Sequence, residues 1–222
     1  MSTKPTKMPA DVAETHELIG RELYYLYTKW TYFKRLFCTD DETIRLLNYA
    51  AEFFFNIYAE VIRDDLILTV CRLTDPASTK VKGQEKANLT VKQLRKLIPV
   101  ADSSLHNSLD PEISVLDSHV EKFREHRNRR IGHHDLDTRR GRSHATVPSL
   151  GLNEMEDALS GIATILDLVE KHYDQDEQPY QNGIYGSGNA EELIQFIRRE
   201  QSLERYFNEK EFGVDEFEVD SE

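Results

Sequence analysis

The sequence predicts an all-α protein, an up-and-down helical bundle with an extra C-terminal helix and an acidic tail. Apolar residues recur every three to five positions through long segments, which is the spacing of an amphipathic helix. No segment of any length alternates apolar and polar residues as a half-buried strand would. The 222 residues suffice for one domain, and no internal repeat interrupts the helical pattern.

The first two helices are expected to be the longest. The first runs from Asp11 to about Cys38, and the second from Thr39-Asp40-Asp41-Glu42 to about Leu73. A capping residue followed by acids suits the positive end of a helix dipole, and Asp75-Pro76 ends the second helix. The first apolar face comprises Leu18, Leu23, Leu26, Trp30, Phe33 and Phe37, and the second Leu47, Ala51, Phe54, Tyr58, Ile62, Leu66, Thr69 and Leu73.

Shorter elements are expected in the middle of the chain. Residues 77–88 are polar and lysine-bearing and are predicted to be a loop, after which Thr90 caps a short helix that continues through Ile98. Residues 103–108 are predicted to be a second loop. Asp110-Pro111-Glu112 then opens a helix, because proline suits a first turn, and this helix continues until Gly132 ends it.

The last third is expected to hold two helices and two irregular segments. Residues 136–151 form a loop, Asn153 caps a helix to about Tyr173, 175–188 form a polar linker, and Asn189 caps a helix to about Phe207. The domain organisation is therefore a disordered 1–10, a bundle over 11–175, a linker and accessory helix over 176–208, and an acidic disordered tail over 209–222. The accessory helix packs either on the bundle or on a second subunit.

Charge and composition limit the classes of function. The formal net charge is −12, which argues against a protein that coats nucleic acid nonspecifically. No run approaches the roughly 20 apolar residues of a membrane helix, and the N-terminus does not resemble a secretory signal. Cys38 and Cys71 are expected to be buried and reduced, so we expect a cytoplasmic protein without membrane contact.

The segment 122–142 departs from this acidic background. It holds eight lysines and arginines against three acids, and residues 127–134 read Arg-Asn-Arg-Arg-Ile-Gly-His-His. Arginine binds phosphate oxygens in a bidentate manner, and histidine transfers protons near neutral pH. Cleavage of RNA without a metal needs a base for the 2′-hydroxyl, an acid for the leaving oxygen and a cation at phosphorus. The segment supplies these residue types.

The spacing of Arg127 and His133 restricts how they can cooperate. In a regular helix, residues six apart differ by about 120° around the axis and about 9 Å along it, so the two side chains do not share a face. Arg129 and His133, four apart, do share one. Either the helix ends near Gly132 and His133 folds back, or two subunits build the site.

The stretch Arg127 to His133 resembles the signature of HEPN domains, an arginine followed by a polar residue and, further on, a histidine. Asp135 and the upstream Arg72-Leu73-Thr74-Asp75 resemble the abortive-infection AbiU-type branch. The resemblance covers about residues 11–175. It implies a dimeric helical bundle with metal-independent endoribonuclease activity, typically in toxin or phage-defence systems. It also implies that Arg127 binds the scissile phosphate, Asn128 orients it or the histidine, and His133 transfers protons.

Several assignments around this core remain predictions. His134, Arg129 and Asp135 are possible auxiliary residues, and His134 leaves the choice of catalytic histidine open. Arg72 and Asp75 are expected to pair or cap locally. No metal site and no cofactor is expected, and a cognate antitoxin or regulatory partner is possible. The alternatives to catalysis are a nucleotide-, RNA- or protein-binding module and a purely structural adaptor. Candidate RNA contacts are Arg124, Arg130, Arg139, Arg140 and Arg142.

Overall fold

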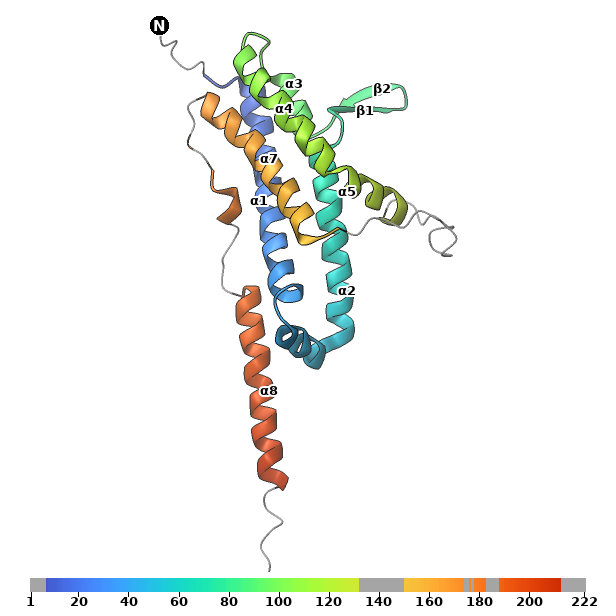
Figure 1. Cartoon of the computed structure of the whole chain (residues 1–222), viewed down its shortest axis with the longest axis vertical. Coiled ribbons are helices and arrows are strands. Elements are labelled where there is room, and N and C mark those ends of the chain that lie inside the picture. The colour runs from blue at the N-terminus through green and yellow to red at the C-terminus, as the bar shows by residue number, and fades with distance from the viewer. Residues whose placement is uncertain (1–6, 132–149, 174–175, 177, 183–187, 213–222) are drawn as a thin grey trace, which may run out of the picture. The chain divides into compact units, whose positions relative to one another are not determined.

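The computed structural model describes residues 7–131, 150–173, 176, 178–182 and 188–212. The fold is all-α apart from one small hairpin, as the sequence predicts (Figure 1). The chain divides into two compact units. Unit 1 takes in residues 1–30 and 61–184, and unit 2 takes in residues 31–60 and 185–222. No helix in the described ranges is both long enough and apolar enough to cross a membrane.

The two long helices are confirmed to within about two residues. They are α1 (Ala10–Phe37) and α2 (Asp41–Thr74). The cap of α2 is Asp40 rather than Thr39, because the Thr43 N–H donates to Asp40 Oδ1 at 2.7 Å. Each helix contributes residues to both units.

The predicted apolar faces are correct only in part. In α1, Ile19 is fully buried, whereas the predicted Leu18 is 39% exposed. In α2, the backbone leaves the helical region at Ala51 (φ −168°, ψ 73°), so the helical phase is interrupted there. As a result Phe55 is buried, and the predicted Phe54 is exposed.

Residues 77–88 are not the predicted loop, because they contain an antiparallel hairpin. Strands β1 (Ser78–Val81) and β2 (Gln84–Ala87) pair with Val81 opposite Gln84. Lys82 and Gly83 form the two-residue turn with φ values of 49° and 80°. Positive φ at both central positions matches the right-handed twist of the strands, and glycine permits it at the second.

The middle helices begin and end differently from the prediction, except for α3. Helix α3 (Val91–Leu97) is capped as predicted, since Thr90 Oγ1 accepts from the Gln93 N–H at 3.0 Å. Helix α4 (Ser103–His119) includes both the predicted loop 103–108 and Pro111. Pro111 lies on the exposed side of α4, while burial of Leu105 and Leu109 holds the first turns on the core.

Helix α4 ends at a break at Val120, and the basic segment follows this break. It consists of α5 (Glu121–His126) and a π-helical turn, η1 (Arg127–Ile131). The predicted helix end at Gly132 and the predicted loop up to residue 149 lie outside the described residues.

Helix α7 (Leu152–His172) packs on α4 in unit 1. It begins before the predicted cap Asn153, because the Gly151 N–H donates to Glu154. A Cβ on Gly161 would lie 3.0 Å from Leu116 Cδ1, so a glycine permits the close approach of the two helices. The core here includes Phe123 of α5 and Leu159 and Ile162 of α7, all fully buried.

The predicted linker 175–188 contains a packed 3-10 turn, η2 (Tyr180–Asn182), in which Tyr180 is buried. Helix α8 (Ala190–Phe212) begins as predicted, with Asn189 accepting from the Glu192 N–H, but extends five residues past Phe207 into the predicted acidic tail. Residues 213–222 lie outside the described residues.

In unit 2, Ala190, Ile194 and Ile197 of α8 pack with Leu47 and Phe55 of α2. Cys71 is buried as predicted, but Cys38 is exposed because it follows the last residue of α1.

Candidate functional site

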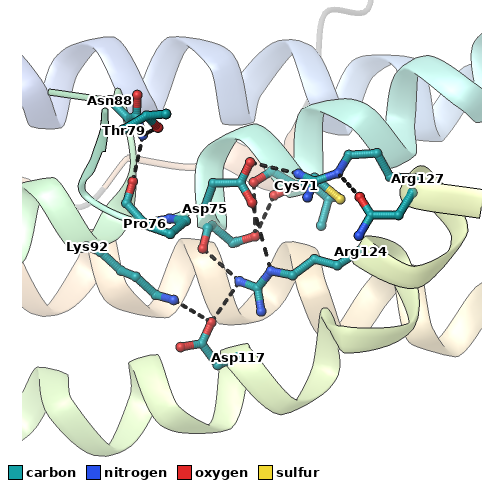
Figure 2. A network of polar contacts seen from close by, with 12 residues as sticks. Cys71, Asp75, Pro76, Thr79, Asn88, Lys92, Asp117, Arg124 and Arg127 are labelled. Atoms are coloured by element: carbon teal, nitrogen blue, oxygen red, sulfur yellow. Dashed lines mark hydrogen bonds and ion pairs between the residues drawn. The ribbon is translucent and has the colours of Figure 1, made fainter. Parts of the chain in front are cut away.

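Arg127 is fixed by two side chains at the junction of α5 and the π-turn (Figure 2). Its Nη1 donates to Asp75 Oδ2 at 2.7 Å, and its Nε donates to Asn128 Oδ1 at 3.2 Å. Both members of the ion pair are about three-quarters buried, with side-chain exposures of 25% and 28%. A guanidinium carries five N–H donors, so two are used here and three remain for a ligand.

Asp75 connects Arg127 to a second arginine. It lies directly after α2, and its Oδ1 is 3.9 Å from the Nε of Arg124. The Nη2 of Arg124 donates to the Thr74 carbonyl and to Asp117 Oδ1, both at 2.8 Å. Lys92 of α3 donates to the same Asp117 oxygen at 2.7 Å. The network therefore joins α2, α3, α4 and α5, and Figure 2 shows it along the end of α2.

The electrostatics of the network favour an anionic ligand. Three cations (Lys92, Arg124 and Arg127) face two carboxylates (Asp75 and Asp117). Burial raises the pKa of Asp117, but hydrogen bonds from Lys92 and Arg124 outweigh burial and hold that pKa below its usual value. Asp117 is therefore ionised near neutral pH, and the network keeps a net charge of +1.

Cys71 lies beside this network without serving as a nucleophile. Burial raises the pKa of its thiol to about 11, although the positive charges of Arg127 and Arg124 act in the opposite direction. The reactive form of cysteine is the thiolate. Near neutral pH, Cys71 is therefore a neutral and apolar neighbour of Arg127.

The π-turn changes the predicted geometry of the basic segment. The six-residue separation of Arg127 and His133 corresponds to about 120° in a regular helix, but residues 127–131 form a π-helix, whose turn is wider than that of an α-helix. Single π-turns inside helices occur frequently at functional sites. His133, His134, Asp135, Arg139, Arg140 and Arg142 lie outside the described residues.

The other candidate arginines of the segment have different surroundings. Arg129 forms an ion pair with Glu125, one helical turn earlier, at 3.2 Å. Arg130 is exposed, and its charge acts on His126. Arg124, a candidate RNA contact, is engaged with Asp117 and with the Thr74 carbonyl. Arg127 and Asn128, two of the candidate residues, are hydrogen-bonded to one another.

Sequence reasoning missed two features of the site. Asp75 was expected to pair or cap locally, but its partner Arg127 is 52 residues away. His126 was not selected as a site residue, yet it is only 6% exposed and its Nδ1 is buried without a hydrogen-bond partner in the described structure. The arginine-rich signature contained the signal for Arg127, but nothing in the sequence indicates which carboxylate holds it.

A cavity of unit 1 lies elsewhere. It has a volume of about 660 Å³, and its lining includes His16, Tyr24, Glu170 and Tyr180 but no residue of the Arg127 network. The described residues hold no group of three or more His, Cys, Asp or Glu side chains arranged for a metal ion.

An all-α bundle with an arginine and an adjacent polar residue after a late helix is the arrangement expected of a HEPN domain. The family model described as AbiU2 matches residues 10–194, and the chain belongs to this AbiU2 family of HEPN domains. Searches for similar curated proteins and for similar solved structures gave no match.

Proposed function

We propose that the protein is a metal-independent endoribonuclease that acts as a homodimer in a bacterial toxin or phage-defence module. The observation that carries this proposal is the guanidinium of Arg127, which Asp75 and Asn128 fix in a cationic network at the start of the HEPN signature. A preorganised cation with spare donors is the group that a phosphate in its transition state requires. Membership of the AbiU2 family supports a role in abortive infection.

The reaction proceeds by attack of the ribose 2′-oxygen on its own phosphate. A base removes the 2′-hydroxyl proton, the O2′–P bond forms, and the P–O5′ bond breaks as an acid protonates the leaving oxygen. The products are a 2′,3′-cyclic phosphate and a 5′-hydroxyl, and no water is consumed in this step. Arg127 donates its remaining N–H groups to the non-bridging oxygens, and Asn128 keeps the guanidinium in plane with them.

His133 is the proton-transfer residue in this proposal, with His134, Arg129 and Asp135 as auxiliary groups. One imidazole cannot be base and acid in the same step. A second copy of the chain supplies the second histidine, so the reaction requires the homodimer. A cognate antitoxin that covers the basic segment is the expected regulatory partner.

The test is incubation of RNA with the purified full chain in EDTA, followed by mass spectrometry of the new ends. Cleavage that leaves cyclic phosphates is expected, with a loss of at least about a hundredfold in Arg127→Ala and His133→Ala. Arg95→Ala is the matched control, because Arg95 is also paired with an aspartate, Asp110, but outside the network. Undiminished cleavage by both site variants, or no cleavage by the parent chain, overturns the proposal.

The binding-module alternative gives a different result in the same experiment. The parent chain would bind RNA or a nucleotide in a salt-sensitive manner, and Arg127→Ala would lose this affinity without any new RNA ends. The observation that favours this alternative is the ion pair with Asp75, which already uses one of the N–H donors of Arg127.

A further inference from the structure

The hairpin β1–β2 contributes almost nothing to the protein core. None of its eight strand residues is buried, and seven of them are exposed. A two-stranded hairpin with no packed face is marginally stable at best in water. Its presence therefore needs a reason other than packing, and the reason is to be found in the side chains that it exposes.

The base of the hairpin is fastened next to Asp75. The Asn88 side-chain amide donates to the Pro76 carbonyl at 2.8 Å and to Thr79 Oγ1 at 2.7 Å, and the Asn88 N–H donates to the Ala77 carbonyl at 2.8 Å. Pro76 follows Asp75, the partner of Arg127. Figure 2 shows these contacts next to the Arg127 network. The hairpin thus extends from the point where the candidate site is fixed.

The exposed side chains of the hairpin are predominantly cationic. Lys80, Lys82 and Lys86 are exposed, and Glu85 is the sole acid between residues 78 and 87. Within the described part of the chain, none of the three lysines makes an ion pair, although Lys80 lies directly across from Glu85. Glu85 instead accepts a hydrogen bond from the Ser78 hydroxyl. A net charge of +2 is thus presented to solvent by a chain of net charge −12.

We propose that the hairpin is a second RNA-binding element, whose lysines contact backbone phosphates beside the one held by Arg127. This inference rests on the proposed function, because it takes RNA as the ligand of the site. Four strand residues extend about 10–13 Å, so the tip serves a different phosphate from the base. Lysine is a flexible point charge that suits the backbone and carries little sequence information.

Exposed lysines have another established role, the protection of strand edges from pairing with other chains. Edge protection predicts that the lysines do not affect RNA affinity. The two explanations therefore differ in a quantity that can be measured directly.

The experiment measures binding of a fluorescent single-stranded RNA to the full chain by anisotropy, in a His133→Ala background so that the probe stays intact. The test variant is Lys80→Gln/Lys82→Gln/Lys86→Gln. The matched control is Lys7→Gln/Lys96→Gln/Lys171→Gln, which removes the same charge from exposed lysines outside the hairpin. At physiological salt, we expect the test variant to bind RNA at least about tenfold more weakly than the His133→Ala background. The control should bind RNA almost as tightly as that background. The slope of log Kd against the logarithm of the salt concentration should decrease by about two, since the variant loses three phosphate contacts and each contributes about 0.7 on single strands.

The outcomes separate this inference from the proposed function. Weak binding by the test variant alone, with no cleavage by the parent chain, supports the hairpin contact and overturns catalysis. Cleavage by the parent chain with equal affinity of both triple variants overturns the hairpin contact alone. The hairpin contact is also overturned if the parent chain does not bind RNA at all. Asn88→Ala keeps the lysines but loosens the base of the hairpin, and we expect it to weaken binding by severalfold.

Discussion

Asp75 and Arg127 form a 2.7 Å ion pair that joins the end of α2 to the π-turn, across 52 positions of the sequence. One oxygen of the Asp75 carboxylate accepts from Arg127, and the other faces Arg124. Because both oxygens are engaged, the carboxylate holds a fixed position and thereby fixes the direction of the Arg127 guanidinium. A pair that is about three-quarters buried is less screened by solvent than a surface salt bridge. Asp75 is therefore a positioning residue for the candidate site.

Asp75→Asn tests this role. The amide keeps the shape of the carboxylate but removes its charge, so Arg127 loses the interaction that fixes its direction. We expect RNA cleavage to fall by about 10–100-fold, since small displacements of a positioning group have effects of that size. The free energy of unfolding should fall by about 1–3 kcal/mol, because the largely buried Arg127 loses its ion-pair partner.

Asp110→Asn is the control for this variant. Asp110 accepts two hydrogen bonds from Arg95, at 2.7 and 2.8 Å, in an exposed pair of α3 and α4. Cleavage by this variant should equal that of the parent chain. If Asp75→Asn also cleaves at the parental rate, Asp75 does not position Arg127.

The buried histidine His126 should make stability depend on pH. Burial, assisted by the positive charge of Arg130, lowers the pKa of His126 below 6.5, although Asp64 acts in the opposite direction. Between pH 6.5 and this lower value, the unfolded chain binds a proton that the folded chain does not. The free energy of unfolding should therefore fall as the pH decreases from about 7 to 5.

His126→Leu removes this titration. Urea unfolding at pH 7.5 and 5.5 should show a smaller loss of stability in the variant than in the parent chain. Some loss remains, because burial also lowers the pKa of His16. At pH 7.5 the variant should be within about 1 kcal/mol of the parent, since leucine removes a buried ring nitrogen that has no partner. Equal losses in both chains would exclude His126 as the source.

Local signals in the sequence predicted the parts of the fold that depend on local interactions. Long amphipathic patterns predicted α1 and α2, and the caps Thr90 and Asn189 marked the starts of α3 and α8. The hairpin was missed because both of its faces are exposed, so its short strands show no alternation of apolar and polar residues. Helix α4 was shortened in the prediction because Pro111 normally starts a helix, whereas core packing here carries the helix through it.

The candidate site was predictable only as far as it is local. Arg127 and Asn128 belong to the predicted signature, but the hydrogen bond between them was not predicted. The choice of Asp75 as the partner of Arg127 depends on how α2 and α5 meet, which no spacing in the sequence encodes. None of the five residues of the π-turn is buried, and no spacing in the sequence marks it.

Tyr180 should stabilise unit 1 through a buried hydrogen bond. Its hydroxyl donates to Glu170 Oε1 at 2.7 Å, and its ring packs on Gly20, where an added Cβ would lie 3.0 Å away. Tyr180→Phe leaves the buried carboxylate with one donor fewer, so we expect a loss of about 1–3 kcal/mol in the free energy of unfolding. Tyr25→Phe, at an exposed tyrosine, should have no measurable effect. Equal stability of the two variants in urea would contradict this assignment.

Two neighbouring residues of α8 should differ sharply in their contribution to unit 2. Ile197 is 5% exposed and belongs to the cluster with Leu47 and Phe55, whereas Phe196 is 69% exposed. Ile197→Ala leaves a cavity in that cluster and should destabilise unit 2 by about 2–4 kcal/mol. Phe196→Ala removes a larger side chain but little buried area, so its effect should stay below about 0.5 kcal/mol.

Amide hydrogen exchange of the full chain measures this difference locally. In Ile197→Ala, protection should fall over residues 190–200 and over the α2 residues near Leu47, while unit 1 keeps its protection. Because the two changes are adjacent and both leave alanine, helix propensity cannot explain a difference between them. If Phe196→Ala lowers protection as much as Ile197→Ala does, α8 is not held in unit 2 by the face that carries Ile194 and Ile197.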